Sequence, residues 1–347
     1  MSISIAFAGD TMLGRGVGAE IASRRPYGLF ADEIREYAGA ADLFAVNLEC
    51  CISARGHPWD GPEKLFHFRA PPQAADALAE LGVTCVTLAN NHALDFGYAA
   101  LADTVEHLSR AGICATGAGA DQDQARAPCV VQAAGVRVTL MGVTDHPADF
   151  AAGPDLPGVA YADLQAGVPH WLTDQVRSAS TSAPSTSAPS TSAPAGDAAA
   201  GDAAAGDNVV LVLPHWGPNM TLGPLSYIRR AARSLTEAGA TLVAGSSAHA
   251  FHGVAGRVLY DLGDFIDDYA TDAVVRNDLG LLFLVTLDGR GPRRIEALPL
   301  KLDYARTEVA DGADRAWITD RFTRACRVLG TNVREEDGHL VAEPDAG

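Results

Sequence analysis

The sequence predicts an α/β fold built around a largely parallel sheet. Five short apolar runs recur along the chain, at residues 3–8, 43–46, 86–89, 209–213 and 241–245, and mostly helical stretches separate them. Short apolar runs bounded by Gly or Pro are typical of buried strands, and strand–helix–strand alternation favours parallel pairing. The carboxyl ends of such strands line one crevice.

Each apolar run ends in side chains that can carry chemistry. In chain order these are Asp10; Asn47 and Glu49; Asn91, His92 and, three residues on, Asp95; His215; and His249. Carboxylates, amides and imidazoles serve as metal ligands or as acids and bases. Because parallel strands bring their carboxyl ends to one edge, we expect these side chains to converge there.

The periodicity between and after these runs predicts the remaining elements. Helices are expected at 73–81, 98–111, 164–176 and 225–238, and strands at 257–260, 281–287 and 294–302. Since no obvious helix separates the last three strands, they predict an antiparallel or mixed sheet. An amphipathic helix is expected at about 314–329, after which the tail is expected to fray.

Residues 178–207 form a low-complexity segment of Ser, Thr, Ala, Pro and Gly-Asp repeats. Such residues bury too little apolar area to offset their ordering entropy, so we expect a disordered insertion. The α/β alternation continues on both sides of it. The sequence therefore predicts one domain over residues 1–303, interrupted by 178–207, and a C-terminal helix and tail over 304–347.

The bulk composition is that of an ordinary globular chain of 347 residues, 48% hydrophobic and 20% charged. The formal net charge of -17 argues against nucleic acid as a partner. Neither a leader peptide nor a membrane span is evident, so the chain is expected to be cytoplasmic. Its six cysteines show no C-x-x-C spacing and are expected to be reduced core residues.

Six motifs resemble the CapA family of bacterial capsule and poly-γ-glutamate synthesis proteins, which is similar in fold to calcineurin-like metallophosphatases. They are Gly9-Asp10-Thr11-Met12-Leu13-Gly14-Arg15, Asn47-Leu48-Glu49, Phe68-Arg69-Ala70-Pro71, Leu88 to Gly97, His215-Trp216-Gly217 and Leu262-Gly263-Asp264-Phe265. They span roughly residues 3–302 in the family's order. The resemblance implies a four-layer α/β/β/α sandwich.

The resemblance also implies roles for the residues at the strand ends. One or two divalent ions (Mn, Fe or Zn) would be held by Asp10, Glu49, Asn91, His215 and His249. His92 would act as general acid or stabilise the transition state, oriented by Asp95. Arg15, Arg69 and Asp264 are candidates for binding substrate.

Two departures from the metallophosphatase pattern concern the metal ligands. Asp10-Thr11-Met12 stands where metallophosphatases usually have Asp-x-His, a change that the CapA family shares. Gly245-Ser246-Ser247-Ala248-His249 lacks a histidine that relatives carry just after the glycine, and His252 is a candidate substitute. His57, His67, His107, His146 and His170 have no partner pattern and receive no role.

Three functions are compatible with these residues. The first is metal-assisted hydrolysis or transfer on a phosphoester or a γ-glutamyl or peptide-type substrate, linked to capsule or poly-γ-glutamate synthesis, with an anionic polymer or peptide as partner. The second is a metal- and cofactor-independent peptide epimerase of ribosomal-peptide biosynthesis, with Asp10 and His249 (or His92) as acid and base. The third is a non-catalytic accessory protein of polymer synthesis.

Overall fold

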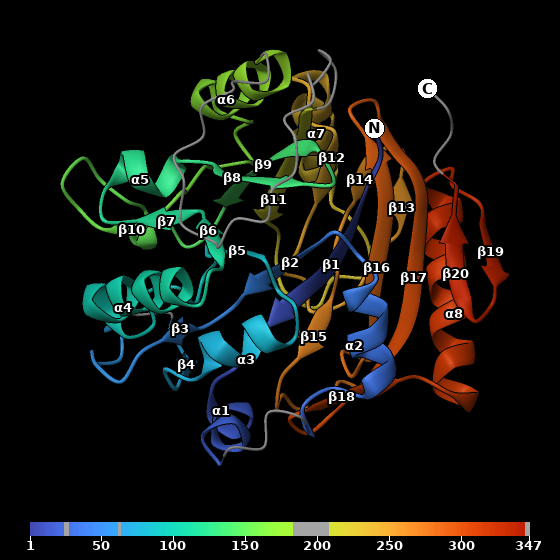
Figure 1. The fold of residues 1–347 in the computed structure, drawn as a ribbon, viewed down its shortest axis with the longest axis horizontal. Helices are drawn as coiled ribbons and strands as arrows, with labels where there is room; N and C mark the ends of the chain where they lie inside the picture. Colours follow the sequence, from blue (N-terminus) through green and yellow to red (C-terminus); the bar gives the residue numbers. More distant parts are fainter. Residues whose placement is uncertain (24–27, 62–63, 183–207, 344–347) are drawn as a thin grey trace, which may run out of the picture.

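The computed structural model describes residues 1–23, 28–61, 64–182 and 208–343, which form two principal β-sheets with helices outside them (Figure 1). The ten-stranded sheet has the order β19-β20-β17-β16-β1-β2-β5-β6, with β15 beside β1 and β18 beside β17. Its strands are β1 (Ile3–Thr11), β2 (Leu43–Leu48), β5 (Cys85–Thr87), β6 (Cys114–Thr116), β15 (Asp264–Ile266), β16 (Leu279–Asp288), β17 (Gly291–Asp303), β18 (Arg306–Val309), β19 (Val333–Glu336) and β20 (His339–Ala342). Pairing is parallel from β15 through β1, β2 and β5 to β6, and antiparallel from β1 through β16 to β19.

The six-stranded sheet has the order β13-β14-β12-β11-β9-β8. Its strands are β8 (Cys129–Ala133), β9 (Val136–Thr144), β11 (Asn208–His215), β12 (Leu242–Ala244), β13 (Val254–Ala255) and β14 (Val258–Leu259). Strands β9, β11, β12 and β14 pair in parallel. The remaining strands form two separate two-stranded sheets. One pairs β3 (Cys51–Ile52) with β4 (Arg69–Ala70), and the other pairs β7 (Ala118–Gly119) with β10 (Gly158–Val159).

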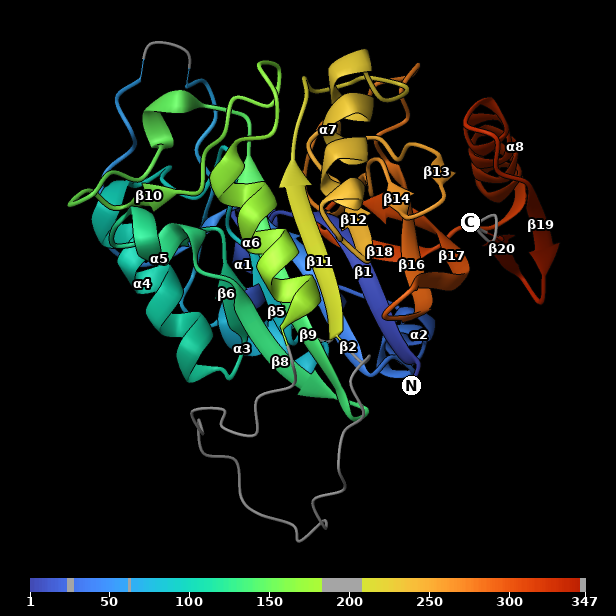
Figure 2. The same cartoon turned by 90° about the horizontal axis from the view of Figure 1, so that it is seen from above.

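Helices pack on the outer faces of both sheets because each presents an apolar stripe. The helices are α1 (Arg15–Ala22), α2 (Asp32–Gly39), α3 (Ala74–Glu80), α4 (Gly97–Arg110), α5 (Gln122–Arg126), α6 (His170–Thr181), α7 (Ser226–Glu237) and α8 (Gly312–Val328), with a 3-10 turn at Ala148–Phe150. Helix α7, for example, buries Ile228, Ala231, Ala232 and Leu235, the spacing of one helical face. Figure 2 shows α6 and α7 lying along the six-stranded sheet.

The largest apolar contacts lie between the sheets and beneath the helices. One cluster joins β1, β16 and β17 to β9, β11 and β12, and α8 closes its edge with Ile318 and Phe322. A second cluster joins the opposite face of β1 and β2 to α1, α2 and α3. A third joins the outer face of β9 and β11 to α6 and α7. Alternate residues of the same strands thus serve two clusters, as the two-residue period of a strand requires.

The predicted α/β class is confirmed, and all five apolar runs are strands. The expectation of one parallel sheet is wrong: β1, β2 and β5 belong to the ten-stranded sheet, whereas β11 and β12 belong to the other. The apolar character of a segment predicts that it is buried, but it does not predict which strand it pairs with, because pairing joins residues that are distant in the chain. The antiparallel pairing expected near residues 281–302 is confirmed by β16 and β17.

Three local expectations need correction. Helix α6 begins at His170 rather than at residue 164, and it extends to Thr181, inside the segment expected to be disordered. The rest of that segment, residues 183–207, lies outside the described residues. The tail does not fray after α8: β19 and β20 form a hairpin whose second strand pairs with β17. Its apolar residues Leu340 and Ala342 join the cluster between the sheets.

The expectation that all six cysteines are reduced is also wrong. Cys114 of β6 and Cys129 of β8 form a disulfide, with a Cα–Cα distance of 6.0 Å. The remaining four cysteines are free and buried. Sequence spacing cannot detect this pair, because its 15-residue separation is closed by the approach of two strands from different sheets.

Helix α4 is held to the loop after β3 by the carboxylate of Asp103. It accepts hydrogen bonds from Ser53 Oγ at 2.6 Å and Arg55 Nε at 2.9 Å. The bond from Arg55 holds the pKa of Asp103 down at about 2 instead of its usual 3.8. Because the folded pKa lies below the unfolded one, this stabilisation is complete above pH 4, roughly, and is lost as the pH falls toward 2.

We therefore expect Asp103→Asn to lower the free energy of unfolding by about 1 kcal/mol at pH 7, since solvent screens the exposed Arg55. Urea denaturation of the variant and wild type should show a difference that shrinks as the pH is lowered from about 5 to 3. Asp155→Asn, at an exposed aspartate, is the matched control. A difference independent of pH would contradict the ionic explanation.

Among the described residues, the structure contains no helix with the length and apolar character needed to cross a membrane.

Candidate functional site

The side chains that follow five strands meet at one buried place between the carboxyl ends of the two sheets. Asp10 lies near the end of β1, Glu49 directly after β2, and His215 is the last residue of β11. Asn91 and His92 follow β5, and His249 follows β12. Asp10, Glu49 and His215 are at most 1% exposed. The predicted convergence is therefore observed, although the strands come from two sheets.

Asp10 is fixed by amide and backbone donors. Asn47 donates from Nδ2 to Asp10 Oδ1 at 2.7 Å, and the backbone N–H of Ser247 donates to Oδ2 at 3.3 Å. Asn90 in turn holds Asn47, donating from Nδ2 to its Oδ1 at 3.0 Å. Burial raises the pKa of Asp10 to about 6, against the lowering effect of His249. Gly9 is needed here because a Cβ on it would lie 1.9 Å from the carbonyl oxygen of Gly263.

Glu49 is a fully buried carboxylate without a donor. Its exposure is 0%, and neither carboxylate oxygen has a hydrogen-bond partner among the described residues. Its Oε1 lies 3.9 Å from Nε2 of both His92 and His215. Burial, followed by the charge of Asp10, raises its pKa well above the usual range. Leaving a buried carboxyl group without a hydrogen-bond partner is costly, so Glu49 is a candidate for a functional role.

His249 lies between two carboxylates. Its Nδ1 is 2.7 Å from Asp264 Oδ1 and 3.4 Å from Asp10 Oδ2. Burial acts to lower the pKa of His249, but Asp264, Glu49 and Asp10 outweigh it and hold the pKa well above its usual value. The backbone here has positive φ at two non-glycine residues, 114° at Ser247 and 54° at His249. Such backbone is sparsely populated, and it is concentrated at functional sites.

His215 is held by neutral partners. Its Nε2 lies 3.1 Å from Asn91 Oδ1, and its Nδ1 lies 3.0 Å from Ser246 Oγ. Burial and the nearby ring of His146 lower its pKa well below the usual value. A neutral imidazole keeps a lone pair available, which is the form that binds metals.

His92 is oriented from behind by a carboxylate and an ammonium group. Its Nδ1 is 2.6 Å from Asp95 Oδ2, and Lys64 Nζ is 2.6 Å from Asp95 Oδ1. Its ring stacks on Phe68 at 4.2 Å between centroids. Burial and then Lys64 lower the pKa of His92 well below its usual value. Because the Nδ1–H group donates a hydrogen bond to Asp95, the ring presents its Nε2 atom toward Glu49.

The ligand atoms fall into two groups that share Asp10. Asp10, Glu49 and His215 form one group, and Asp10, His249 and Asp264 form the other, each with its ligand atoms within 4.8 Å of one another. Asn91 adjoins the first group through His215. Carboxylate and imidazole donors of this kind suit Mn, Fe or Zn.

Four further sequence candidates differ in how they contact this centre. Asp264, expected to bind substrate, contacts His249 and so belongs to the second ligand group. Arg15 pairs with Asp268 at 3.2 Å, and its guanidinium lies 5.7 Å from the Phe68 ring centroid. Arg69 is exposed and lies over the Phe96 ring at 4.2 Å. His252 lies outside both ligand groups, and its Nε2 donates a hydrogen bond to the Thr221 carbonyl at 2.9 Å.

The sequence analysis missed three residues at this centre. His146 lies 5.2 Å from His215 between ring centroids, and it follows β9, whose apolar run ends in Asp145-His146, the signal used at the other strands. Lys64 comes from an irregular loop and had no sequence signal. Tyr269 is partly buried, and its ring meets the His249 ring edge-on at 5.4 Å between centroids.

The fold and the site together define an α/β protein with a buried carboxylate–histidine centre at converging strand ends. The model of the bacterial capsule synthesis protein family PGA_cap matches residues 4–269. The chain belongs to this family.

The curated relatives agree with this assignment. A probable polyglutamine synthesis accessory protein of Mycobacterium tuberculosis is 32% identical over 318 residues, covering 87% of this chain and 77% of its own. The PGA biosynthesis protein CapA of Bacillus subtilis is 26% identical, covering 87% and 72% respectively. A crystal structure of a hypothetical protein from Thermus thermophilus aligns with a TM-score of 0.45 and 14% identity, covering 86% of this chain and 99% of its own.

Proposed function

We propose that this protein is a metal-assisted enzyme that hydrolyses or transfers glutamyl amide bonds in capsule or poly-γ-glutamate synthesis. The observation that carries the proposal is Glu49, a carboxylate with no exposure and no hydrogen-bond donor, facing two histidines. The choice of a glutamyl substrate is supported by relatives named for polyglutamine and PGA synthesis. A phosphoester is the other substrate class compatible with these residues, and it serves as the comparison substrate in activity assays.

We further propose that the fold is the four-layer α/β/β/α sandwich of metallophosphatases. Three apolar clusters support it: one between the two sheets, and one between each sheet and its outer helices. In that fold the ligands would be Asp10, Glu49, Asn91, His215 and His249, with Asp264 close to His249.

The residues present fit a divalent metal, because an anionic group at Glu49 and the neutral imidazole of His215 are the donor types required. A bound ion would supply Lewis acidity toward the substrate oxygen and lower the pKa of a water molecule. The protein's own contribution is positioning. Asn47 and Ser247 hold Asp10, while Asp264 holds the ring of His249.

His92 is the residue suited to move a proton. Asp95 and Lys64 fix its ring from the Nδ1 side, so Nε2 is free to give a proton to a leaving group or take one from an attacking water. Burial favours the neutral ring at rest, which suits a base in the first step and an acid in the next.

The contact between Asp10 and His249 favours this function over epimerisation by that pair. An epimerase needs its acid and base on opposite faces of one α-carbon, but Asp10 Oδ2 and His249 Nδ1 are 3.4 Å apart. At this distance a peptide does not fit between them. The accessory role without catalysis gives no reason for the unpaired carboxylate of Glu49.

His215→Gln tests the choice between these functions. We expect it to reduce bound metal in elemental analysis and to lower cleavage of a γ-linked glutamate oligomer by about 100-fold or more, since ligand loss exceeds the effect of outer partners. His252→Gln is the matched control, a buried histidine bonded to Thr221 away from the ligands. Solvent deuterium entering a peptide, undiminished in His215→Gln and in chelator, would overturn the proposal in favour of the epimerase. If wild-type protein shows neither bound metal nor turnover, the non-catalytic accessory role would be favoured instead.

A further inference from the structure

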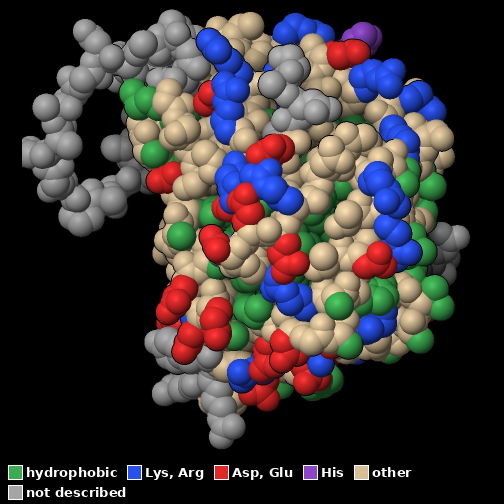
Figure 3. All heavy atoms as spheres, turned by 90° about the vertical axis from the view of Figure 1, so that its right-hand side faces the viewer, with side chains coloured by type: hydrophobic (Ala, Val, Ile, Leu, Met, Phe, Trp, Pro, Cys, Tyr) green, Lys and Arg blue, Asp and Glu red, His purple; other side chains and the backbone are tan. Residues whose placement is uncertain are grey.

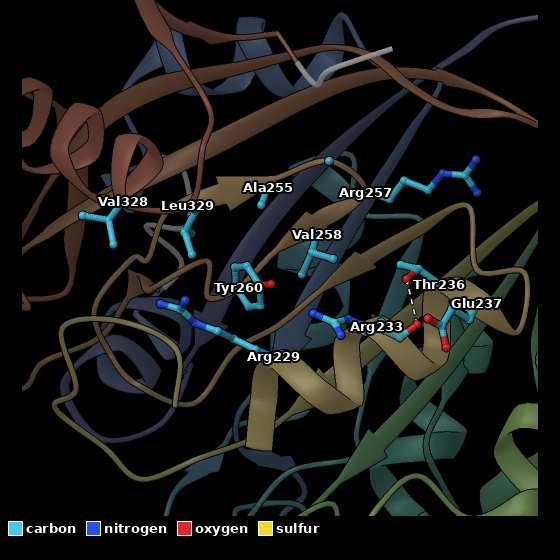
Figure 4. Close-up of a pocket in the computed structure, with 11 residues that line it drawn as sticks. Arg229, Arg233, Thr236, Glu237, Ala255, Arg257, Val258, Tyr260, Val328 and Leu329 are labelled. Carbon is cyan, nitrogen blue, oxygen red and sulfur yellow. Dashed lines mark hydrogen bonds between the residues drawn. The ribbon is translucent and has the colours of Figure 1, made fainter. Parts of the chain in front are cut away.

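A hollow of about 650 Å³ lies on the surface between α7, the β13–β14 hairpin and the end of α8. Figure 4 shows Arg229 and Arg233 rising from α7 toward Tyr260 and Val258, with Arg257 on the hairpin turn. None of these residues belongs to the ligand groups described above. We call this region the arginine hollow and define it by Arg229, Arg233, Arg257 and Tyr260.

The arginines of the hollow lack anionic partners. Arg229 and Arg233 are one helical turn apart, a spacing at which like charges repel. Among the described residues neither they nor Arg257 makes an ion pair, and Arg229 donates only to the Pro224 carbonyl at 3.3 Å. Glu237 is the one acidic residue that lines the hollow. In a chain of net charge -17, where carboxylates are abundant, this local excess of positive charge is unusual.

Two arginines on the neighbouring surface are held by other groups of the protein. Arg324 pairs with Asp320 on α8, and Arg321 donates to the carbonyls of Val275 and Phe251 while lying over the rings of Phe251 and Trp317. Figure 3 shows Lys and Arg side chains interspersed with Asp and Glu over the face that carries α8. What distinguishes the hollow is that Arg229, Arg233 and Arg257 line one depression together with a single acidic residue, Glu237.

Tyr260 gives the hollow a neutral donor beside the two guanidinium groups. It is 8% exposed, and burial raises its pKa while Arg229 and Arg233 act in the opposite direction. Its backbone carbonyl accepts a hydrogen bond from Trp216 Nε1 at 2.9 Å, and the next residue, Asp261, accepts one from the Ala248 N–H at 2.9 Å. The wall of the hollow is thus joined to the residues that flank His215 and His249.

We propose that the arginine hollow binds successive carboxylates of an anionic glutamyl chain at a site separate from the metal ligands. Guanidinium groups bind carboxylates through paired hydrogen bonds, and two arginines one turn apart can engage neighbouring units of one chain. The preference for carboxylates over phosphates rests on the proposed function. A nucleic acid is the competing polyanion, and the relatives named for polyglutamine and PGA synthesis favour the glutamyl chain over it.

The test measures binding of a fluorescein-labelled, γ-linked glutamate decamer by anisotropy at low salt. We expect Arg229→Gln with Arg233→Gln to weaken binding about tenfold or more, because two charged hydrogen-bond partners are lost. Arg230→Gln is the control: it removes one positive charge from α7 at a position that does not line the hollow, and each single variant, Arg229→Gln and Arg233→Gln, is compared with it. The affinity of this control for the decamer should stay within about twofold of wild type, because a charge outside the hollow acts only through screened, long-range attraction. Should the double variant fail to fold, Arg257→Gln on the exposed turn gives the same comparison.

The proposal would be overturned by no decamer binding by wild type, by equal binding by the double variant, or by equal binding of an uncharged γ-linked decamer whose α-carboxylates are replaced by amides. Tighter binding of a single-stranded DNA decamer would also overturn it. Asp10→Ala separates this proposal from the proposed function, since it should keep decamer binding while losing turnover. If the wild type contains no metal and shows no turnover but still binds the decamer through these arginines, the binding proposal would be supported and the proposed enzymatic function refuted.

Discussion

Asp10→Ala is expected to release the divalent metal and to lower turnover by more than about 100-fold, since a shared ligand should matter more than an outer partner. Asp10 belongs to both ligand groups, with Glu49 and His215 in one and with His249 and Asp264 in the other. Its loss therefore disrupts both positions at once. Folding should survive, because burial raises the pKa of Asp10 to about 6 and so acts against its charged form in the folded protein.

The measurement is elemental analysis of the dialysed variant beside wild type, followed by turnover of a γ-linked glutamate oligomer. Asp155→Ala, at an exposed aspartate, controls for the loss of a carboxylate. About one or two equivalents of metal in wild type and in the control, and none in Asp10→Ala, would support the proposed centre. Full metal content in Asp10→Ala would refute its assignment as a shared ligand.

Glu49→Gln is expected to have opposite effects on stability and on metal binding. In chelator-treated protein it should raise the free energy of unfolding by about 1–3 kcal/mol at pH 7.5, because it removes a buried carboxylate that lacks donors. With metal present the order should reverse, since wild type gains binding energy that the amide cannot match. Conflict between stability and function at one residue is common in functional sites.

The stability of the metal-free protein should also depend on pH, because the pKa of Glu49 differs between the folded and the unfolded state. The folded pKa of Glu49 lies well above its usual 4.5, so the folded state keeps a proton that the unfolded state has released. Stability of the metal-free wild type should therefore fall as the pH rises from about 5 toward 8, and Glu49→Gln should show a weaker decline. Urea denaturation at both pH values with chelator provides the measurement. A variant less stable than wild type without metal would show that Glu49 has a structural partner after all.

Much of the site was predictable from the order of residues in the chain. Asp10, Glu49 and His215 each end or follow an apolar run, and a strand that is buried must place its next polar residue at the sheet edge. His146 obeys the same rule after β9 and could have been found with it. Lys64 could not, because it lies in an irregular loop and acquires its role only by contact with Asp95.

The C-terminal segment shows the corresponding limit for the fold. The 3.6-residue period predicted α8, which the structure places at Gly312–Val328. The hairpin of β19 and β20 escaped prediction because its strands are four residues each, too short for an alternating pattern to stand out. What stabilises it is pairing with β17, about forty positions earlier in the chain.

The sequence by itself determined many of the buried strands and helices, the polar residues at the ends of five strands, and the family to which the chain belongs. These properties depend on neighbouring residues or on motifs in a fixed order. Only the tertiary structure decided which strands belong to which of the two sheets, that Cys114 meets Cys129, and that Glu49 faces two histidines without a donor. Each of these depends on contacts between segments distant in the chain, which hydrophobic periodicity cannot specify.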